Sequence, residues 1–264
     1  MNGFYGLLIA VSMYSKIPVP RVEWTGPRLR YVMCWFPMVG VICGVVLWLW
    51  FSLAWHLEIH PVCAGMAGSC IPLFISGGIH MDGFLDTVDA RSSYGDREKK
   101  LEILKDPHTG AFAIIGALVY MVFYCACMIQ LFYDGIEPEG RRMAAAFCLV
   151  FALERAFSGL SVAIFPCAKS SGLARTFSDG AQKKTVVWVL AGWIFVLVMG
   201  TGAISGFLAA ALTLITGGVI FLYYRHVSEK EFGGITGDLA GWFLQLFEAA
   251  VLAALTAGAR YLLL

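Results

Sequence analysis

Charged residues are scarce in this sequence, and their scarcity excludes an ordinary soluble domain. Asp, Glu, Lys and Arg make up 14% of the 264 residues, whereas 59% are hydrophobic. Soluble domains typically contain about 25% charged residues. The composition therefore predicts a protein whose solvent is the lipid bilayer. The net charge of +1 gives no electrostatic reason to expect a nucleic-acid partner.

Paired cysteines are also missing, because none of the eight cysteines forms a CxxC pair. Most of them fall within apolar runs, where a thiol behaves as a small apolar side chain, so we expect neither disulfides nor a cysteine metal site. The sequence lacks internal repeats, low-complexity tracts and interdomain linkers. We therefore predict a single integral membrane domain over residues 1–264.

Long apolar runs dominate what is present. A membrane-spanning helix needs about 20 apolar residues, and suitable runs lie near 31–55, 62–79, 111–133, 143–166, 186–202, 203–224 and 240–262. Gly200, Gly202 and Gly206 favour a turn between the fifth and sixth runs. The predicted fold is an all-α polytopic membrane protein with about seven transmembrane helices. The apolar stretch at 4–14 is too short to span comfortably and lacks the basic leader of a cleaved signal peptide, so it predicts an interfacial or re-entrant helix.

Basic residues concentrate in alternate loops between these runs. One set of loops receives Lys16, Arg21, Arg28, Arg30, Arg91, Arg97, Lys99, Lys100, Lys105, Lys169, Arg175, Lys183, Lys184, Arg225 and Lys230. The opposite set receives Arg141, Arg142 and Arg260. Cytoplasmic loops carry the excess of Lys and Arg. We therefore predict a cytoplasmic N-terminus, cytoplasmic charged loops and an external C-terminus.

Five of the eight aspartates gather in the segment 80–106. Asp82, Asp86 and Asp89 are spaced so that a helix places them on one face, about one turn apart. A solvated helix face is the usual explanation in a soluble protein, but this column directly follows an apolar run and has no interleaved base before Arg91. Crowded carboxylates at a membrane boundary protonate or bind a cation, and oxygen ligands suit Mg²⁺. The leading hypothesis is Mg²⁺-assisted chemistry on phosphoryl groups.

Residues around the aspartate column are candidates for binding substrate. His80 suits a general base or a ligand, or alternatively a hydrogen bond at a helix start. Arg91 and Lys105 suit phosphate oxygens. Gly77 and Gly78 allow a close backbone approach to a ligand or a break between helices, although membrane glycines often serve helix packing alone.

Charge also occurs inside an apolar run, at Glu154 and Arg155. An intramembrane ionisable residue is a functional candidate by default. Side chains of neighbouring residues point in different directions around a helix. We therefore expect each to have its own partner, with Arg155 facing the aspartate column or a phosphate; the alternative is a structural ion pair across the bundle.

A glycine-rich turn precedes the last apolar run. Gly233, Gly234, Thr236 and Gly237 lead to Asp238 at its mouth. Such a turn at the start of a helix suits an anion or phosphate. A simple re-entry turn into the membrane would also use glycine.

Motifs across nearly the whole chain resemble the cobalamin synthase family of bacterial vitamin B12 assembly, the cobalamin 5'-phosphate synthases or adenosylcobinamide-GDP ribazoletransferases. They are SKIPVP at 15–20, FPMVGVICG at 36–44, GGIHMDGFLDTVDA at 77–90, LEILKDPHTG at 101–110, SGLARTF at 171–177 and GGITGD at 233–238. The HMDGxxDTxD string is the most specific of them. Ala90, Pro107 and Ala113 depart from the family pattern, which questions local loop geometry more than metal binding.

The resemblance implies a reaction and a site. α-Ribazole or its 5'-phosphate attacks the cobinamide-linked phosphorus of adenosylcobinamide-GDP, GMP leaves, and Mg²⁺ is the expected cofactor. The implied metal ligands are Asp82, Asp86 and Asp89, with Asp106 and Asp238 as secondary candidates. His80 or an aspartate would orient the attacking group. The groups expected to bind phosphate are Arg91, Lys105 and Arg155, together with the turns at Gly77, Gly78, Gly233, Gly234 and Thr236.

Two other classes stay open. The substring DTVDAR resembles part of the aspartate signature of CDP-alcohol phosphotransferases, and a cation transporter also places carboxylates near a membrane. Transport sites tend to lie near the bilayer midplane, whereas the aspartates here extend into a long hydrophilic loop, which favours an enzyme. We expect a multi-pass protein of the bacterial cytoplasmic (inner) membrane. Its candidate partners are a second copy of itself or other B12-pathway enzymes.

Overall fold

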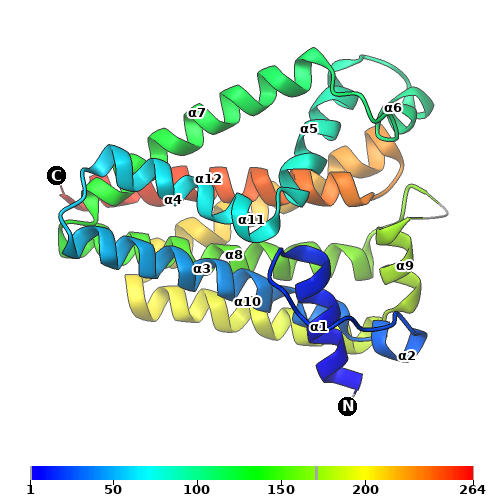
Figure 1. Cartoon of the computed structure of the whole chain (residues 1–264), viewed down its shortest axis with the longest axis horizontal. Helices are drawn as coiled ribbons and strands as arrows, with labels where there is room; N and C mark the ends of the chain where they lie inside the picture. The colour runs from blue at the N-terminus through cyan, green and yellow to red at the C-terminus, as the bar shows by residue number, and fades with distance from the viewer. Residues whose placement is uncertain (1, 170–171, 264) are drawn as a thin grey trace.

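The structure is a computed structural model that describes residues 2–169 and 172–263 as a bundle of helices (Figure 1). Its long apolar helices are α3 (Val32–His56), α7 (Ala111–Asp134), α8 (Pro138–Ile164), α10 (Lys183–Ser205), α11 (Phe207–Val227) with the π-helix η1 (Ser228–Phe232), and α12 (Gly237–Leu263). These give six candidate spans, and a seventh is reached if α4 (Pro61–Ser76) and α5 (Ile79–Ser92) are counted as one bent span. The prediction of an all-α polytopic membrane protein with about seven spans is confirmed.

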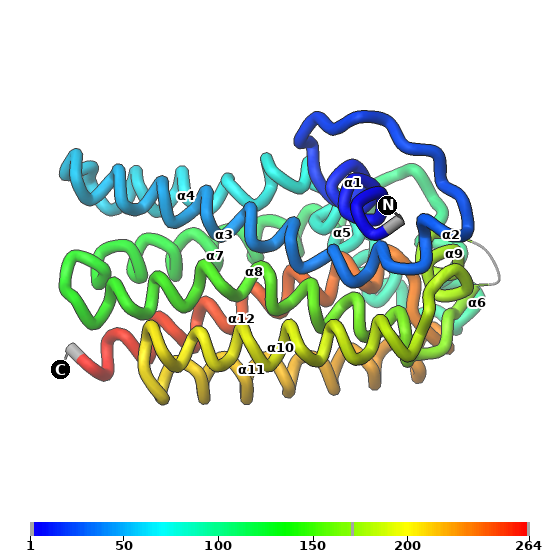
Figure 2. The backbone as a smooth tube through the Cα atoms, turned by 90° about the horizontal axis from the view of Figure 1, so that it is seen from below, coloured from blue at the N-terminus to red at the C-terminus, as the bar shows by residue number. Residues whose placement is uncertain are grey.

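Four shorter helices complete the chain: α1 (Asn2–Tyr14), α2 (Gly26–Leu29), α6 (Arg97–Ile103) and α9 (Leu173–Gly180). They gather with α5 at one end of the bundle, whereas the α7–α8 turn and the C-terminus lie at the other end (Figures 1 and 2). The loops rich in Lys and Arg therefore share the end that carries α5. The predicted turn between the fifth and sixth runs lies at Gly206, whose φ of 87° requires glycine.

Helix α8 forms the centre of the bundle, and α3, α10 and α12 pack around it (Figure 2). Gly40 and Gly44 of α3 face the α8 backbone so closely that a Cβ atom at either position would collide with a carbonyl oxygen, that of Phe151 or Cys148. This spacing is the small-xxx-small pattern, which lets two membrane helices approach closely and gain dispersion contacts. The close contact between α3 and α8 therefore requires glycine at both positions.

Replacing Gly40 with alanine is expected to lower the free energy of unfolding by about 1–3 kcal/mol, the usual cost of overpacking. The added methyl group must push α3 away from the Phe151 carbonyl. Gly192→Ala is the matched control, because a Cβ atom at this glycine of α10 meets open space. Unfolding in detergent micelles, titrated with SDS, measures both variants. Equal losses would contradict the close contact.

Candidate active site

Two glycines turn the chain sharply between α4 and α5. Gly77 and Gly78 have φ angles of 66° and 81°, and the two helices meet at a bend of 95°. A side chain at Gly77 would also collide with that of Lys16, whose backbone N–H donates to the carbonyl of Ile75 at 2.8 Å. The predicted helix break is confirmed. A role of these glycines in binding a ligand stays a prediction.

The bend directs α5, and the three aspartates lie on this one helix as the sequence predicts. Asp82 is exposed and faces a cavity, whereas Asp86 and Asp89 are half-buried. The Asp89 carboxylate packs over Gly110, at the start of α7, where any added side chain would collide with it. The aspartate column thus lies at one end of the bundle, with Asp82 at the cavity and Asp89 against the start of α7.

Close glycine contacts bring Asp238 to this column. A Cβ atom at Gly83 would lie 2.6 Å from the Asp238 carbonyl oxygen, and one at Gly241 would lie 2.8 Å from the His80 carbonyl oxygen. The start of α12 can therefore rest directly on α5, which sets Asp238 beside Asp82 on the wall of one cavity. The Lys169 ammonium lies 3.9 Å from the Asp238 carboxylate.

The glycine-rich turn before α12 has a structural role in this arrangement. Gly233 and Gly234 have φ angles of 73° and 147°, and a Cβ atom at Gly234 would lie 2.5 Å from the Pro166 carbonyl oxygen. The Thr236 hydroxyl accepts a hydrogen bond from the backbone N–H of Leu239 at 3.1 Å, which caps α12. The predicted contact of this turn with a phosphate stays a prediction.

Negative charge is concentrated where α5 meets α12. Helix α5 lies outside the six long apolar helices, and burial there raises the pKa of Asp86 to about 6, with further increases from Asp82, Asp238 and Asp89. Among the described residues, no three His, Cys, Asp or Glu side chains are placed to hold a metal ion together. The set nevertheless fits Mg²⁺, which usually binds one or two carboxylates and keeps waters and substrate phosphates. A cation would relieve the mutual repulsion.

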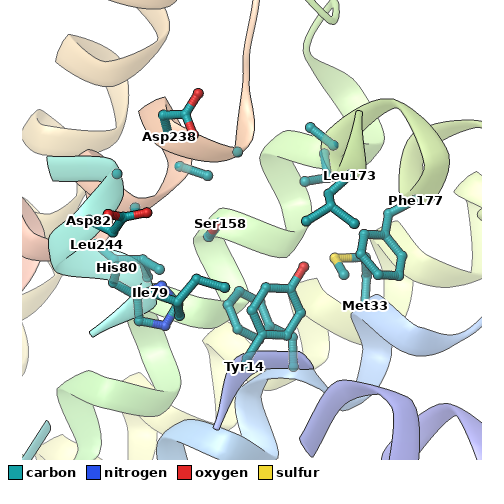
Figure 3. Close-up of a pocket in the computed structure, with 17 residues that line it drawn as sticks. Tyr14, Met33, Ile79, His80, Asp82, Ser158, Leu173, Phe177, Asp238 and Leu244 are labelled. Carbon is teal, nitrogen blue, oxygen red and sulfur yellow. The ribbon is translucent and has the colours of Figure 1, made fainter. Parts of the chain in front are cut away.

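Two cavities meet at this carboxylate group. The first, of about 270 Å³, has Asp82 and Asp238 on one side and Met33 and Phe177 on the other, with Tyr14 between them (Figure 3). The second, of about 240 Å³, is lined by the basic side chains of Lys169 and Arg175. They share the wall residues Leu173, Ala174, Gly237 and Asp238. We call the first the aromatic chamber and the second the basic cleft.

His80 forms part of the wall of the aromatic chamber. Its imidazole is buried, stacks on Tyr14 at a centroid distance of 6.3 Å and lies 6.2 Å from the Phe36 ring. Its Nε2 atom has no hydrogen-bond partner within the described part of the chain. Burial lowers the pKa of His80, and the positive charge of Arg155 lowers it further. The sequence-based prediction of a role in catalysis is compatible with this position and stays untested.

Other predicted site residues form local contacts away from the chamber. Arg91 pairs with Glu231 at 3.0 Å and lies over the Trp242 ring. The exposed Asp106 accepts a hydrogen bond from the backbone N–H of His108 at 2.9 Å, and this contact lowers the pKa of its carboxyl group. Lys105 is exposed in the same loop. None of Arg91, Lys105 and Asp106 lines the aromatic chamber or the basic cleft.

Arg155 is buried in the bundle and pairs with its neighbour Glu154. Its guanidinium also donates to the Phe151 carbonyl at 2.8 Å. The expectation that each residue has its own partner is wrong, because the long arginine side chain folds back onto the adjacent glutamate. A structural ion pair is present, but it joins adjacent residues of α8 and does not cross the bundle as the alternative had it. Arg155 lines neither cavity.

Comparison with known proteins agrees with the sequence motifs. The profile of the family described as cobalamin-5-phosphate synthase matches residues 6–256. The chain belongs to this family. A Lachnoclostridium phytofermentans protein named adenosylcobinamide-GDP ribazoletransferase is 40% identical over 244 residues, 92% of this chain and 90% of the relative. Relatives of that name from Clostridium botulinum (strain Alaska E43 / Type E3) and Ectopseudomonas mendocina are 32% and 30% identical, covering 94% of this chain and 95% and 96% of their own lengths.

No solved structure matches this chain. The resemblance inferred from the motifs is confirmed by the family match and by these relatives.

Proposed function

We propose that this protein joins adenosylcobinamide-GDP to α-ribazole or its 5'-phosphate, releasing GMP and forming adenosylcobalamin or its 5'-phosphate. The family and its relatives support this reaction. The observation that carries it is the meeting of the aromatic chamber and the basic cleft at Asp82 and Asp238. Two substrate parts can thus approach each other beside carboxylates.

The transfer exchanges one phosphorus–oxygen bond for another. A ribose hydroxyl of α-ribazole attacks the phosphorus attached to cobinamide, and the bond from that phosphorus to the bridging oxygen breaks, so that GMP leaves. The hydroxyl proton passes to Asp82 or Asp238, whose carboxylates orient the nucleophile. Lys169 and Arg175 in the basic cleft bind the diphosphate oxygens. Such transfers depend mainly on positioning and on neutralising charge.

The reaction is proposed to require Mg²⁺. One or two of the carboxylates of Asp82, Asp86 and Asp238 would hold the ion together with water and substrate phosphates, and the ion would supply positive charge to the phosphate oxygens. Burial and then the neighbouring carboxylates raise the pKa of Asp86, and this crowding of negative charge supports the assignment. Asp89 contacts the start of α7 and would act as a secondary ligand.

The basic end of the bundle is proposed to face the cytoplasm of the bacterial inner membrane. The loops that contain most of the Lys and Arg residues lie at that end, together with α5 and its aspartates. Both substrates are polar and soluble in water, so they reach this end from the cytoplasm without crossing the hydrocarbon core.

The test is GMP release from adenosylcobinamide-GDP. Detergent-purified protein is expected to release GMP when α-ribazole and Mg²⁺ are both present, and to stop when EDTA removes the metal. Excess Mg²⁺ should restore release. Inside-out membrane vesicles should react with added substrates, whereas right-side-out vesicles should not. Folded protein that releases no GMP under any of these conditions contradicts the proposed reaction, and release that continues in EDTA contradicts only the metal.

A further inference from the structure

The aromatic chamber contains more ring surface than phosphoryl transfer requires. Tyr14, Phe36, Phe177 and His80 come from α1, α3, α9 and α5, respectively, and all line the same cavity. The ring centroids of Tyr14 and Phe36 are 4.2 Å apart, and those of Tyr14 and Phe177 are 6.2 Å apart. Four separate elements thus bring rings to one cavity, alongside aliphatic side chains such as Ile79, Val162 and Leu244.

The size of the chamber limits what it can hold. Its volume of about 270 Å³ lies just below the roughly 300–1,000 Å³ of pockets that enclose a whole drug-sized ligand. A corrin macrocycle is therefore too large, whereas one fused pair of aromatic rings fits. The proposed substrates offer three such ring systems: guanine, adenine and dimethylbenzimidazole.

The number of polar groups on each ring, compared with those of the chamber wall, distinguishes the three candidates. Purines carry several ring nitrogens, and guanine and adenine also carry exocyclic polar groups, which lose binding energy when buried without partners. The described wall offers few polar groups beside the carboxylates: the Tyr14 hydroxyl, the His80 imidazole and the Ser158 hydroxyl. Dimethylbenzimidazole presents two methyl groups on one edge and, once joined to ribose, a single free ring nitrogen. The buried Nε2 atom of His80, which lacks a partner in the described residues, is a counterpart for that nitrogen.

We propose that the aromatic chamber is the subsite for the dimethylbenzimidazole ring of the ribazole substrate, stacked against Tyr14 and Phe177, with His80 as its polar partner. The assignment rests on the proposed function and adds to it which substrate enters which cavity. With the ring in the chamber, the ribose extends toward Asp82 and Asp238, at the border with the basic cleft. The diphosphate of the other substrate then lies in the cleft, beside Lys169 and Arg175.

The test separates the Michaelis constants of the two substrates. Phe177→Ala is expected to raise the KM for α-ribazole by about tenfold or more, the effect of removing an aromatic stacking partner of a base. The KM for adenosylcobinamide-GDP should change by less than about twofold, because KM reports the binding that was removed. Phe207→Ala, at an exposed phenylalanine at the opposite end of the bundle, is the matched control and should change neither constant.

A second measurement requires no variant, so it does not depend on the folding of Phe177→Ala. Free 5,6-dimethylbenzimidazole should inhibit the wild-type protein competitively with α-ribazole, whereas guanine should not compete with α-ribazole. A KM increase confined to adenosylcobinamide-GDP, or competition with α-ribazole by guanine and not by dimethylbenzimidazole, would overturn the assignment while GMP release still supports the reaction. Absence of GMP release from folded wild-type protein would remove both proposals.

Discussion

Replacing Asp82 with asparagine is expected to slow GMP release by about 100- to 1,000-fold, the loss seen when one preorganised electrostatic contact to a reacting group is removed. Asp82 is exposed to the aromatic chamber and lies next to Asp238 through the Gly83 contact. Among the described residues it forms no ion pair, so its charge is available to a substrate or a cation. Asparagine keeps the size of the side chain and removes that charge. The rate is measured at saturating substrates and Mg²⁺.

The matched control for this variant is Glu139→Gln. Glu139 is an exposed carboxylate in the first turn of α8, at the opposite end of the bundle from α5. The control should keep the wild-type rate, and circular dichroism should show the same helix content for both variants. A rate for Asp82→Asn within about twofold of wild type would rule out this carboxylate as part of the reaction, since a contact that stabilises the transition state affects the rate by far more.

Features that depend on neighbouring residues could be predicted from the sequence. The spans follow from unbroken apolar runs, and the aspartate column follows from spacing within a single helix. The break at Gly77 and Gly78 follows from the conformational freedom of glycine. The spans, the aspartate column and the helix break are each determined by a few consecutive residues, so they can be predicted without knowing which distant segments pack together.

Features that depend on distant segments could not be predicted in this way. Asp238 lies beside the column because Gly83 allows α12 to pack closely on α5. No sequence pattern predicts which helix a given glycine faces. The rings of the aromatic chamber come from Tyr14, Phe36 and Phe177, which are far apart in the chain. A partial signal exists for Phe177, because the family motif at 171–177 ends on it. Aromatic residues are too common in a membrane protein for their presence alone to mark a site.

The buried pair of Glu154 and Arg155 links the stability of the bundle to the site. Arg155 lies over the Phe36 ring at 5.9 Å, and Phe36 in turn packs on Tyr14 in the wall of the aromatic chamber. The Glu248 carboxyl group of α12 neighbours that of Glu154, so a single guanidinium serves two acidic groups. Its removal would leave both buried carboxyl groups without a countercharge.

Replacing Arg155 with leucine is therefore expected to lower the free energy of unfolding by about 3–5 kcal/mol, the usual cost of removing one partner of a buried ion pair. SDS titration of the protein in detergent micelles measures this loss. The matched control is Arg142→Leu, at an exposed arginine of the same helix, which should change stability by less than about 0.5 kcal/mol. Adding Glu154→Leu to Arg155→Leu should recover part of the loss, because Glu248 is then the one buried carboxyl group of this cluster left without a countercharge. Equal stability of the two single arginine variants would show that the buried ion pair does not stabilise the bundle.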